Sequence, residues 1–157
     1  MTGGKQDKSK QEESKMDAKQ FNRLLAELKA CEDARKWCKG KTLAEAWATC
    51  ERADWMLWLL ARHIGKPGWP SHQELVFAAC DCAMTARKHT ESKTRKSFDT
   101  TIKAARAWAK DPTEENRIAA DAAAYAADAA PYAAAYAARK KMCAIIRKRV
   151  PTVGEDQ

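Results

Sequence analysis

Residues 121–139 read DAAAYAADAAPYAAAYAAR, and more than half of them are alanine. Alanine has the highest intrinsic helix propensity, so this stretch favours an α-helix over a strand. No glycine lies between Asp111 and position 154, and the helical pattern therefore extends to about Arg149, where Pro151 ends it. Pro131 removes one backbone hydrogen bond inside the pattern. We expect one bent helix or two nearly collinear ones.

Local sequence signals mark the helix starts in the chain before residue 121. Asp111-Pro-Thr-Glu114 predicts a start with an acidic cap, a proline in the first turn and a glutamate after it. Three capping boxes, each a polar cap followed three residues later by Glu or Gln, begin at Asp17, Thr42 and Ser71. Gly40 and Gly65 stand where helices should end.

These signals predict helices throughout and no strand or hairpin. The first helix extends from Asp17 through Trp37 or breaks near Cys31, and others cover 42–50, 55–64, 71–84 and 98–109. Valine, isoleucine and threonine, which suit strands, are few. The fold class is therefore all-α: a single-domain bundle of about six helices with a long, proline-kinked, alanine-rich C-terminal helix.

The chain of 157 residues fits one domain. Residues 1–16 are polar and form a predicted disordered tail, 17–151 form the helical bundle, and 152–157 form a flexible C-terminal tail. No apolar run reaches the roughly 18 residues needed to cross a bilayer, and the N-terminus has no signal-peptide core. We therefore expect a cytoplasmic protein with no membrane partner, whose six cysteines are free thiols.

Residues 51–63, ERADWMLWLLARH, are apolar around nearly the whole helix, which predicts a place in the middle of the bundle. Trp55, Trp58 and Arg62 share a face by their spacing. They either pack in the core or form a tryptophan–arginine stack at a pocket wall. Asp54 either favours the positive end of the helix dipole, with Arg52 as a partner, or contacts a ligand. Asp54, Trp55 and Arg62 are thus candidate binding residues.

The alanine-rich helix carries its large polar residues in one row. The spacings of four, four, three and four residues place them on a single helical face, while alanines cover the rest. That row is either a hydrogen-bonded seam sealed inside the bundle or a recognition surface for a cationic group. The candidate binding residues of this row are Arg117, Asp121, Tyr125, Asp128 and Tyr132, continued by Tyr136 and Arg139.

The sequence offers no signature of catalysis or of a metal site. Cys80 and Cys82 are two apart in a predicted helix, so they point to nearly opposite sides and cannot hold one metal ion. The glycines form no phosphate-binding pattern, and no nucleophile–base pair or paired carboxylates are visible. We expect neither a catalytic residue nor a cofactor nor a metal. The net charge of +8 is spread along the chain, which does not indicate nucleic acid.

Several segments carry a resemblance to a known family. The chain resembles the bacterial immunity proteins, which are small all-helical proteins with a tryptophan-rich DWMLW element, a cysteine pair and a long Ala/Tyr/Asp helix. The resemblance covers roughly residues 28–151. It is carried by AEAWATCERADWMLWLL (44–60), ELVFAACDCA (74–83), AARAWAKD (104–111), ADAAAYAADAAPYAAAYAA (120–138) and CAIIRKRVP (143–151).

The resemblance implies a protein that binds and neutralises a toxin or a defence effector, so a protein partner is the first expectation. An alternative is a small-molecule binder that sequesters a nucleotide signal in defence or phage counter-defence. Six tryptophans, three tyrosines and the positive charge balance could supply its stacking and anion contacts.

Overall fold

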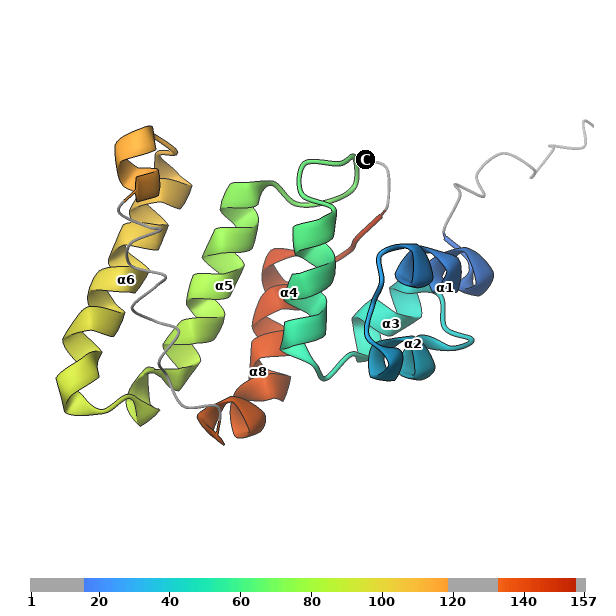
Figure 1. The fold of residues 1–157 in the computed structure, drawn as a ribbon, viewed down its shortest axis with the longest axis horizontal. Helices are drawn as coiled ribbons and strands as arrows, with labels where there is room; N and C mark the ends of the chain where they lie inside the picture. The colour runs from blue at the N-terminus through green and yellow to red at the C-terminus, as the bar shows by residue number, and fades with distance from the viewer. Residues whose placement is uncertain (1–15, 119–132, 155–157) are drawn as a thin grey trace, which may run out of the picture.

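The computed structural model describes residues 16–118 and 133–154 of the chain; in α8, side chains are described from Lys140 onward. Its helices are α1 (Ala18–Glu27), α2 (Glu32–Cys38), α3 (Leu43–Thr49), α4 (Ala53–Arg62), α5 (His72–Ala86), α6 (Ser92–Lys110) and α8 (Ala133–Arg149), with a 3₁₀ turn, η1, at Arg87–His89 (Figure 1). No strand occurs within these ranges, so the all-α class is confirmed. None of the described helices is both long enough and apolar enough to cross a bilayer.

The three capping boxes form as predicted. The side chains of Asp17, Thr42 and Ser71 each accept a hydrogen bond from the backbone N–H three residues on, and the Glu or Gln there closes the box. Each such cap is worth about 1 kcal/mol because it satisfies N–H groups that have no partner inside the helix.

The first predicted helix breaks near Cys31, which is one of the two alternatives that the sequence left open. The chain leaves α1 at Leu28 and Lys29 takes a positive φ of 57°, which turns it toward the start of α2. The Asn22 side chain joins the two helices by donating to the Cys38 carbonyl at 3.3 Å. The expected number of about six helices is therefore approximate.

The helix start predicted at Asp111 is wrong by two residues. Asp111 ends α6 as its C-terminal cap. Thr113 instead caps the following helical turn, because its hydroxyl accepts from the Asn116 N–H at 3.2 Å and its carbonyl accepts from the Arg117 N–H. The course of the chain around Pro131 lies outside the described residues.

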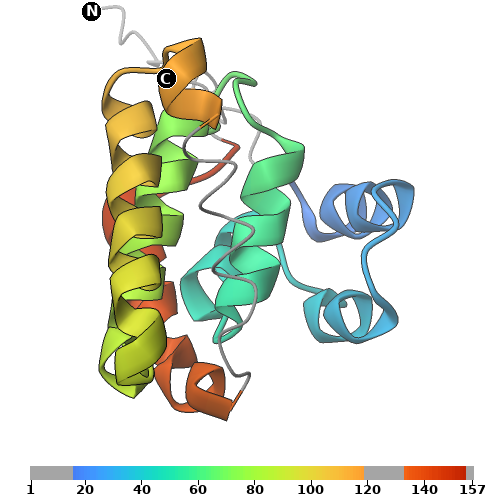
Figure 2. The ribbon, with the colours of Figure 1, turned by 60° about the vertical axis from the view of Figure 1, so that its left-hand side comes forward.

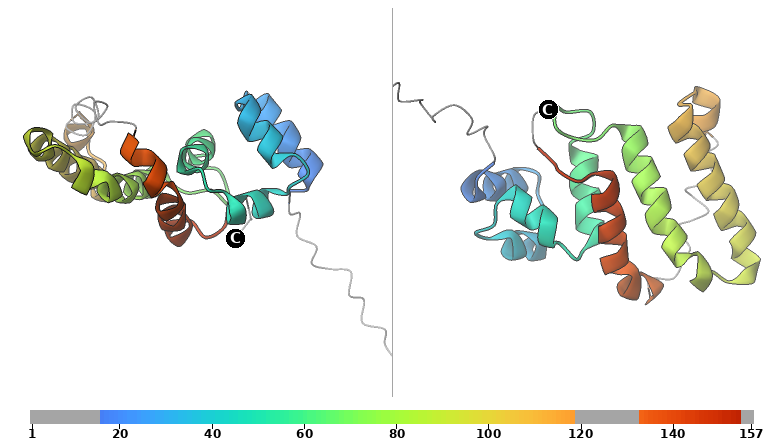
Figure 3. Two further views of the ribbon diagram at one scale, coloured as in Figure 1. Left: turned by 90° about the horizontal axis from the view of Figure 1, so that it is seen from below. Right: turned by 180° about the vertical axis from the view of Figure 1, so that it is seen from behind.

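The long helices form a layer. α5 packs against α6 on one side and against α8 on the other, and α8 also packs on α4 (Figure 3). The shorter helices α1, α2 and α3 gather at the α4 edge of this layer, away from α5 and α6 (Figure 1), and Figure 2 shows α1 and α2 standing apart from the long helices. The main core, which includes Leu60, Cys143 and Ile146, joins α4 and α8 to this group of short helices.

The positions of Cys80 and Cys82 confirm the prediction that they point apart. Cys82 belongs to the main core, whereas Cys80 packs with Phe98 and Ile102 in a smaller core between α5 and α6. Both thiols are buried, as expected for small apolar residues.

The end of α8 and the residue after it form hydrogen bonds with the corner between α3 and α4. The Arg147 guanidinium donates to the carbonyls of Trp47 and Cys50, both at 3.0 Å, and the Trp47 indole N–H donates to the Val150 carbonyl at 3.0 Å. These bonds connect positions about a hundred residues apart in sequence. They fix α3, a helix of only seven residues, against the end of the longer α8.

The predicted flexible tail begins at residue 152, and the described part of it contacts the folded chain. Val153 is buried, and Gly154 donates its N–H to the Gly68 carbonyl at 2.9 Å. Gly154 has a φ of +68°, and a Cβ there would lie 2.9 Å from a Leu43 methyl carbon. The packing of this segment against the 65–70 turn explains its burial, which depends on contacts that sequence composition does not reveal.

Asp81 on α5 ties three helices together. It accepts from Arg106 of α6 at 2.8 Å and from Arg149 of α8, whose guanidinium also lies over the Phe77 ring. Burial opposes ionisation of the carboxyl, but the hydrogen bonds from Arg149 and Arg106 outweigh it and lower the pKa of Asp81. Arg106 of α6 is thus part of an inter-helix contact.

We expect Asp81→Asn to lower the free energy of unfolding by about 1–2 kcal/mol at pH 7, because two half-exposed arginines lose a charged acceptor. A carboxyl whose pKa is lowered on folding stabilises the fold fully above its ordinary value of 3.8. That contribution disappears as the pH falls through the lower folded value. Urea unfolding at pH 7 and pH 3 should therefore show a difference between variant and wild type that shrinks at pH 3. Glu115→Gln is the exposed control, and equal stabilities at pH 7 would contradict the prediction.

Candidate functional site

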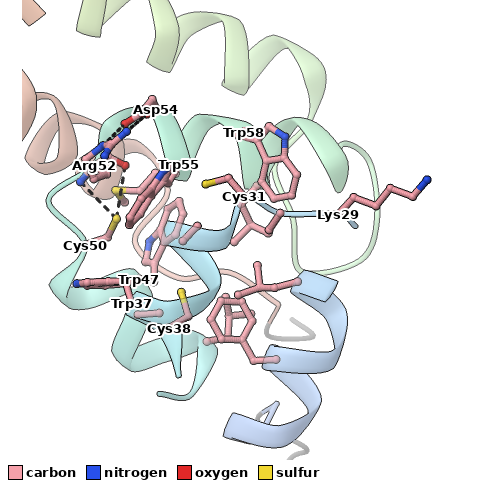
Figure 4. A pocket seen from close by; sticks show the side chains of 18 residues that line it. Lys29, Cys31, Trp37, Cys38, Trp47, Cys50, Arg52, Asp54, Trp55 and Trp58 are labelled. Carbon is pink, nitrogen blue, oxygen red and sulfur yellow. Dashed lines mark hydrogen bonds and ion pairs between the residues drawn. The ribbon is translucent and has the colours of Figure 1, made fainter. Parts of the chain in front are cut away.

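A pocket of about 520 Å³ opens among α1, α2, α3 and the first half of α4 (Figure 4). Its volume lies within the roughly 300–1,000 Å³ of typical ligand pockets. The pocket exists because α2 and α3 are short and are separated by turns, so they cannot align along α4 and fill the space. Its inner wall is apolar and includes the nearly inaccessible side chains of Phe21, Leu25 and Met56.

Four tryptophans from three helices line this pocket. Trp37 comes from α2, Trp47 from α3, and Trp55 and Trp58 from α4. Trp47 is buried, while the other three are half-buried and keep part of their surface accessible. The rings of Trp37 and Trp55 lie 6.0 Å apart at 53°, a tilted arrangement favoured by aromatic quadrupoles.

Cations cover the accessible indoles. The Lys41 ammonium lies 4.5 Å from the Trp37 ring centroid, and the guanidinium carbons of Arg52 and Arg62 lie 4.5 Å and 5.3 Å from Trp55 and Trp58. Lys41 also donates to the Trp37 carbonyl at 2.6 Å, which holds its side chain along the ring. The tryptophan–arginine stack that the sequence left open as an alternative is thus present, with the Trp55 and Trp58 rings on the pocket wall.

Asp54 lies at the mouth of the pocket as the partner of Arg52. The two side chains form a bidentate ion pair with N–O distances of 2.9 and 2.6 Å. Asp54 is also in the first turn of α4, near the positive end of the helix dipole. Both structural roles that the sequence allowed, the dipole position and the pairing with Arg52, are therefore present. The pair keeps the Arg52 guanidinium stacked on Trp55.

Three cysteines also line the pocket: Cys31, Cys38 and Cys50. Burial raises the pKa of the Cys38 thiol to about 11 and also raises that of Cys50, so both are protonated near neutral pH. A protonated thiol is neither a nucleophile nor a metal ligand. The described residues contain no group of three or more His, Cys, Asp or Glu side chains placed to hold a metal ion.

Of the other predicted site residues, Arg117 is described with its side chain, and it does not line this pocket. Arg117 is exposed and pairs with Glu114, with N–O distances of 2.6 and 2.8 Å. Tyr136 and Arg139 lie on α8, but their side chains are not among those described. Asp121, Tyr125, Asp128 and Tyr132 lie outside the described residues, so the choice between a sealed seam and an open surface stays a prediction.

Of the residues that the sequence proposed, Asp54 and Trp55 line the pocket, whereas Arg62 lies over the Trp58 ring without lining it. The sequence did not predict the wall that Trp37 of α2 and Trp47 of α3 contribute. The available signal was the density of tryptophan, since four of the six fall between positions 37 and 58. That density marks an aromatic cluster but does not show whether the cluster is filled or hollow.

Comparisons with models of protein families, with curated proteins and with solved structures find no match to this chain.

The cysteines should differ sharply in reactivity in the native protein. Cys31 is exposed, whereas Cys38, Cys50, Cys80, Cys82 and Cys143 are buried. Burial raises the pKa of Cys82 to about 12 and that of Cys143 to about 11, so both thiols remain protonated at pH 8. With a thiol-specific colorimetric reagent at pH 8, we expect one thiol to react rapidly and the other five only after denaturation. Cys31→Ser should abolish the fast phase. A fast phase that survives this change would contradict the burial of the other five thiols.

Proposed function

We propose that this chain is an immunity-type binding protein that neutralises a toxin or defence effector in the cytoplasm by direct contact. The partner would place an apolar anchor in the tryptophan-lined pocket. The observation that carries the proposal is the convergence of four indoles from α2, α3 and α4 on one open pocket. Its support from sequence is the resemblance to bacterial immunity proteins, whose DWMLW element corresponds to residues 54–58 and supplies two of these rings.

The composition of the pocket suits protein recognition. Tryptophan and arginine are the residues most enriched among those that dominate binding energy, and such residues cluster in pockets from which water is excluded. Here Trp55 and Trp58 are each covered by an arginine, which holds the ring in place before a partner arrives. Preorganised side chains lose less entropy on binding, so more of the contact energy is expressed as affinity.

The proposal is tested with the product of the neighbouring gene as the candidate toxin. We expect the wild-type chain to form a complex with it and to rescue growth. Trp58→Ala should weaken the complex by about 30-fold or more, as for a residue worth about 2 kcal/mol. Trp108→Ala on α6 is the matched control, because that ring contacts His72 and lies outside the pocket.

Circular dichroism and thermal melting of each variant separate a lost contact from a lost fold. Absence of a complex and of growth rescue by the wild-type chain would count against the proposal. Equal losses in the Trp58 and Trp108 variants would count against the pocket as the contact surface.

A second candidate function is the sequestering of a small molecule such as a nucleotide signal. The volume of about 520 Å³ and the mostly apolar wall favour this alternative, because indole faces can stack on a nucleobase. The mouth offers few groups for phosphates, since Arg52 is already paired with Asp54.

Titration with nucleotides and cyclic nucleotides distinguishes the two candidates. If the second is correct, one compound should quench tryptophan fluorescence saturably. At 100 times its Kd it should raise Tm by roughly 5–10 °C. Trp55→Ala should remove both effects and Trp108→Ala should keep them. A flat response across the panel would eliminate this candidate.

A further inference from the structure

We propose that His63 is an acid-sensitive switch that controls whether residues 151–154, the C-terminal segment, pack against the rest of the chain. The inference goes beyond the proposed function and does not depend on it. It is drawn from the stacking of the His63 ring on Trp69 and from the contacts that Trp69 and its turn make with the segment.

His63 lies at the end of α4 with its ring almost fully covered. Only 4% of the residue is accessible, and its ring is stacked on Trp69 with centroids 4.0 Å apart and an interplanar angle of 17°. The Nδ1 atom lies 3.0 Å from the Leu59 carbonyl oxygen. Because a carbonyl can only accept, Nδ1 carries the proton of the neutral ring. A second proton would go on Nε2, which has no hydrogen-bond acceptor within the described part of the chain.

Trp69 also lies against the C-terminal segment. A Cβ on Gly154 would be 3.6 Å from the nearest Trp69 ring atom and 2.9 Å from a Leu43 methyl carbon, so the Gly154 backbone lies close to both side chains. Its N–H donates to the Gly68 carbonyl, in the residue next to Trp69, at 2.9 Å. Val153 is buried in the main core. The packing of the segment therefore depends on the position of the turn that carries Trp69.

The surroundings of His63 favour its neutral form. Burial lowers the pKa of His63 below its ordinary value of 6.5 and outweighs the hydrogen bond to Leu59, which raises it. The Lys66 ammonium lowers the pKa further. An imidazolium must therefore regain water, and it does so most directly by leaving the stack on Trp69.

The other charged side chains around the turn supply no partner for an imidazolium. Glu74 lies beside the turn, but its carboxylate accepts from the Ser71 N–H at 2.7 Å. Arg149, also beside the turn, is a cation and is bonded to Asp81. The preceding residue in α4, Arg62, is a cation too, and residues 151–154 carry no charge.

The direction of the pH effect follows from the lowered pKa. The neutral ring stabilises the packed arrangement fully above about pH 6.5, and as the pH falls below that value the released form takes up the proton more readily. Upstream, the Val150 carbonyl accepts from Trp47 independently of His63, so the release is confined to the segment. Leu43, which lines the tryptophan-lined pocket, then loses its contact with Gly154.

The test is ¹H–¹⁵N NMR of the full-length chain between pH 7.5 and pH 5. We expect the His63 ring nitrogens and the Gly154 amide to titrate with a common midpoint below 6.5. The backbone order parameter of Gly154 should fall from about 0.85 to below about 0.6 across this range. Carboxyl groups titrate mostly at lower pH, so Glu155 and Asp156 do not produce this response.

Two variants separate the ring from its proton. His63→Phe keeps a flat ring against Trp69 but cannot take up a proton, so Gly154 should stay ordered at pH 5. His72→Gln is the matched control, because it removes a histidine that contacts Trp108 and should leave the Gly154 response unchanged.

A third variant tests the coupling from the other side and does not alter His63. Gly154→Ala should release the segment at every pH, because the added Cβ meets the Leu43 methyl carbon and the φ of +68° is strained for alanine. Since the coupling is reciprocal, the pKa of His63 should then rise toward 6.5. An unchanged His63 pKa in a folded Gly154→Ala variant overturns the inference.

The Trp47 indole N–H distinguishes release of the segment from global unfolding. It donates to the Val150 carbonyl and should keep its resonance at pH 5. Loss of this resonance together with the order of Gly154 would show global acid unfolding and overturn the inference. Full order of Gly154 at pH 5, or the same pH response in His63→Phe, would overturn it as well. These measurements use no partner, so the proposed function is tested separately.

Discussion

The arrangement of this protein depends on the hydrogen bonds between the end of α8 and the corner between α3 and α4. Arg147 donates to two carbonyls of that corner, and Trp47 donates its indole N–H back to the Val150 carbonyl. The corner needs these partners, because the seven residues of α3 are too few for a helix to be stable alone. Trp47 belongs both to these hydrogen bonds and to the pocket lining, so its bond to Val150, the longest-range hydrogen bond among the described residues, helps to position the pocket wall.

The pocket is a consequence of unequal helix lengths. Between the long helices α5 and α6, the buried side chains of Cys80, Phe98 and Ile102 fill the space. Where α1, α2 and α3 meet α4, short helices joined by turns leave a hollow that large indoles surround without filling. Lys41, Arg52 and Arg62 lie over three of these indole rings, and the indole-lined hollow is the basis of the function we propose.

The features that the sequence predicted well are those decided by residues three or four apart. The capping boxes at Asp17, Thr42 and Ser71 form because each hydroxyl or carboxylate meets a backbone N–H within its own turn. The start predicted at Asp111 failed for a local reason: Asp111 completes the preceding helix, and Thr113 is the next residue with a side chain able to cap. The ion pair between Asp54 and Arg52, which the sequence offered as one alternative, also joins residues only two positions apart.

By itself the sequence determined the all-α class, the helix starts capped by Asp17, Thr42 and Ser71, and the opposite orientations of Cys80 and Cys82, because helix propensity, capping and the 3.6-residue period act within a few residues. Only the tertiary structure decided that Trp37, Trp47, Trp55 and Trp58 line one pocket, that Val153 is buried, and that Asp81 joins α5 to both α6 and α8. These outcomes depend on which helix faces meet. A helix face offers the same apolar surface to several possible neighbours, and the choice among them is made by packing across the whole chain.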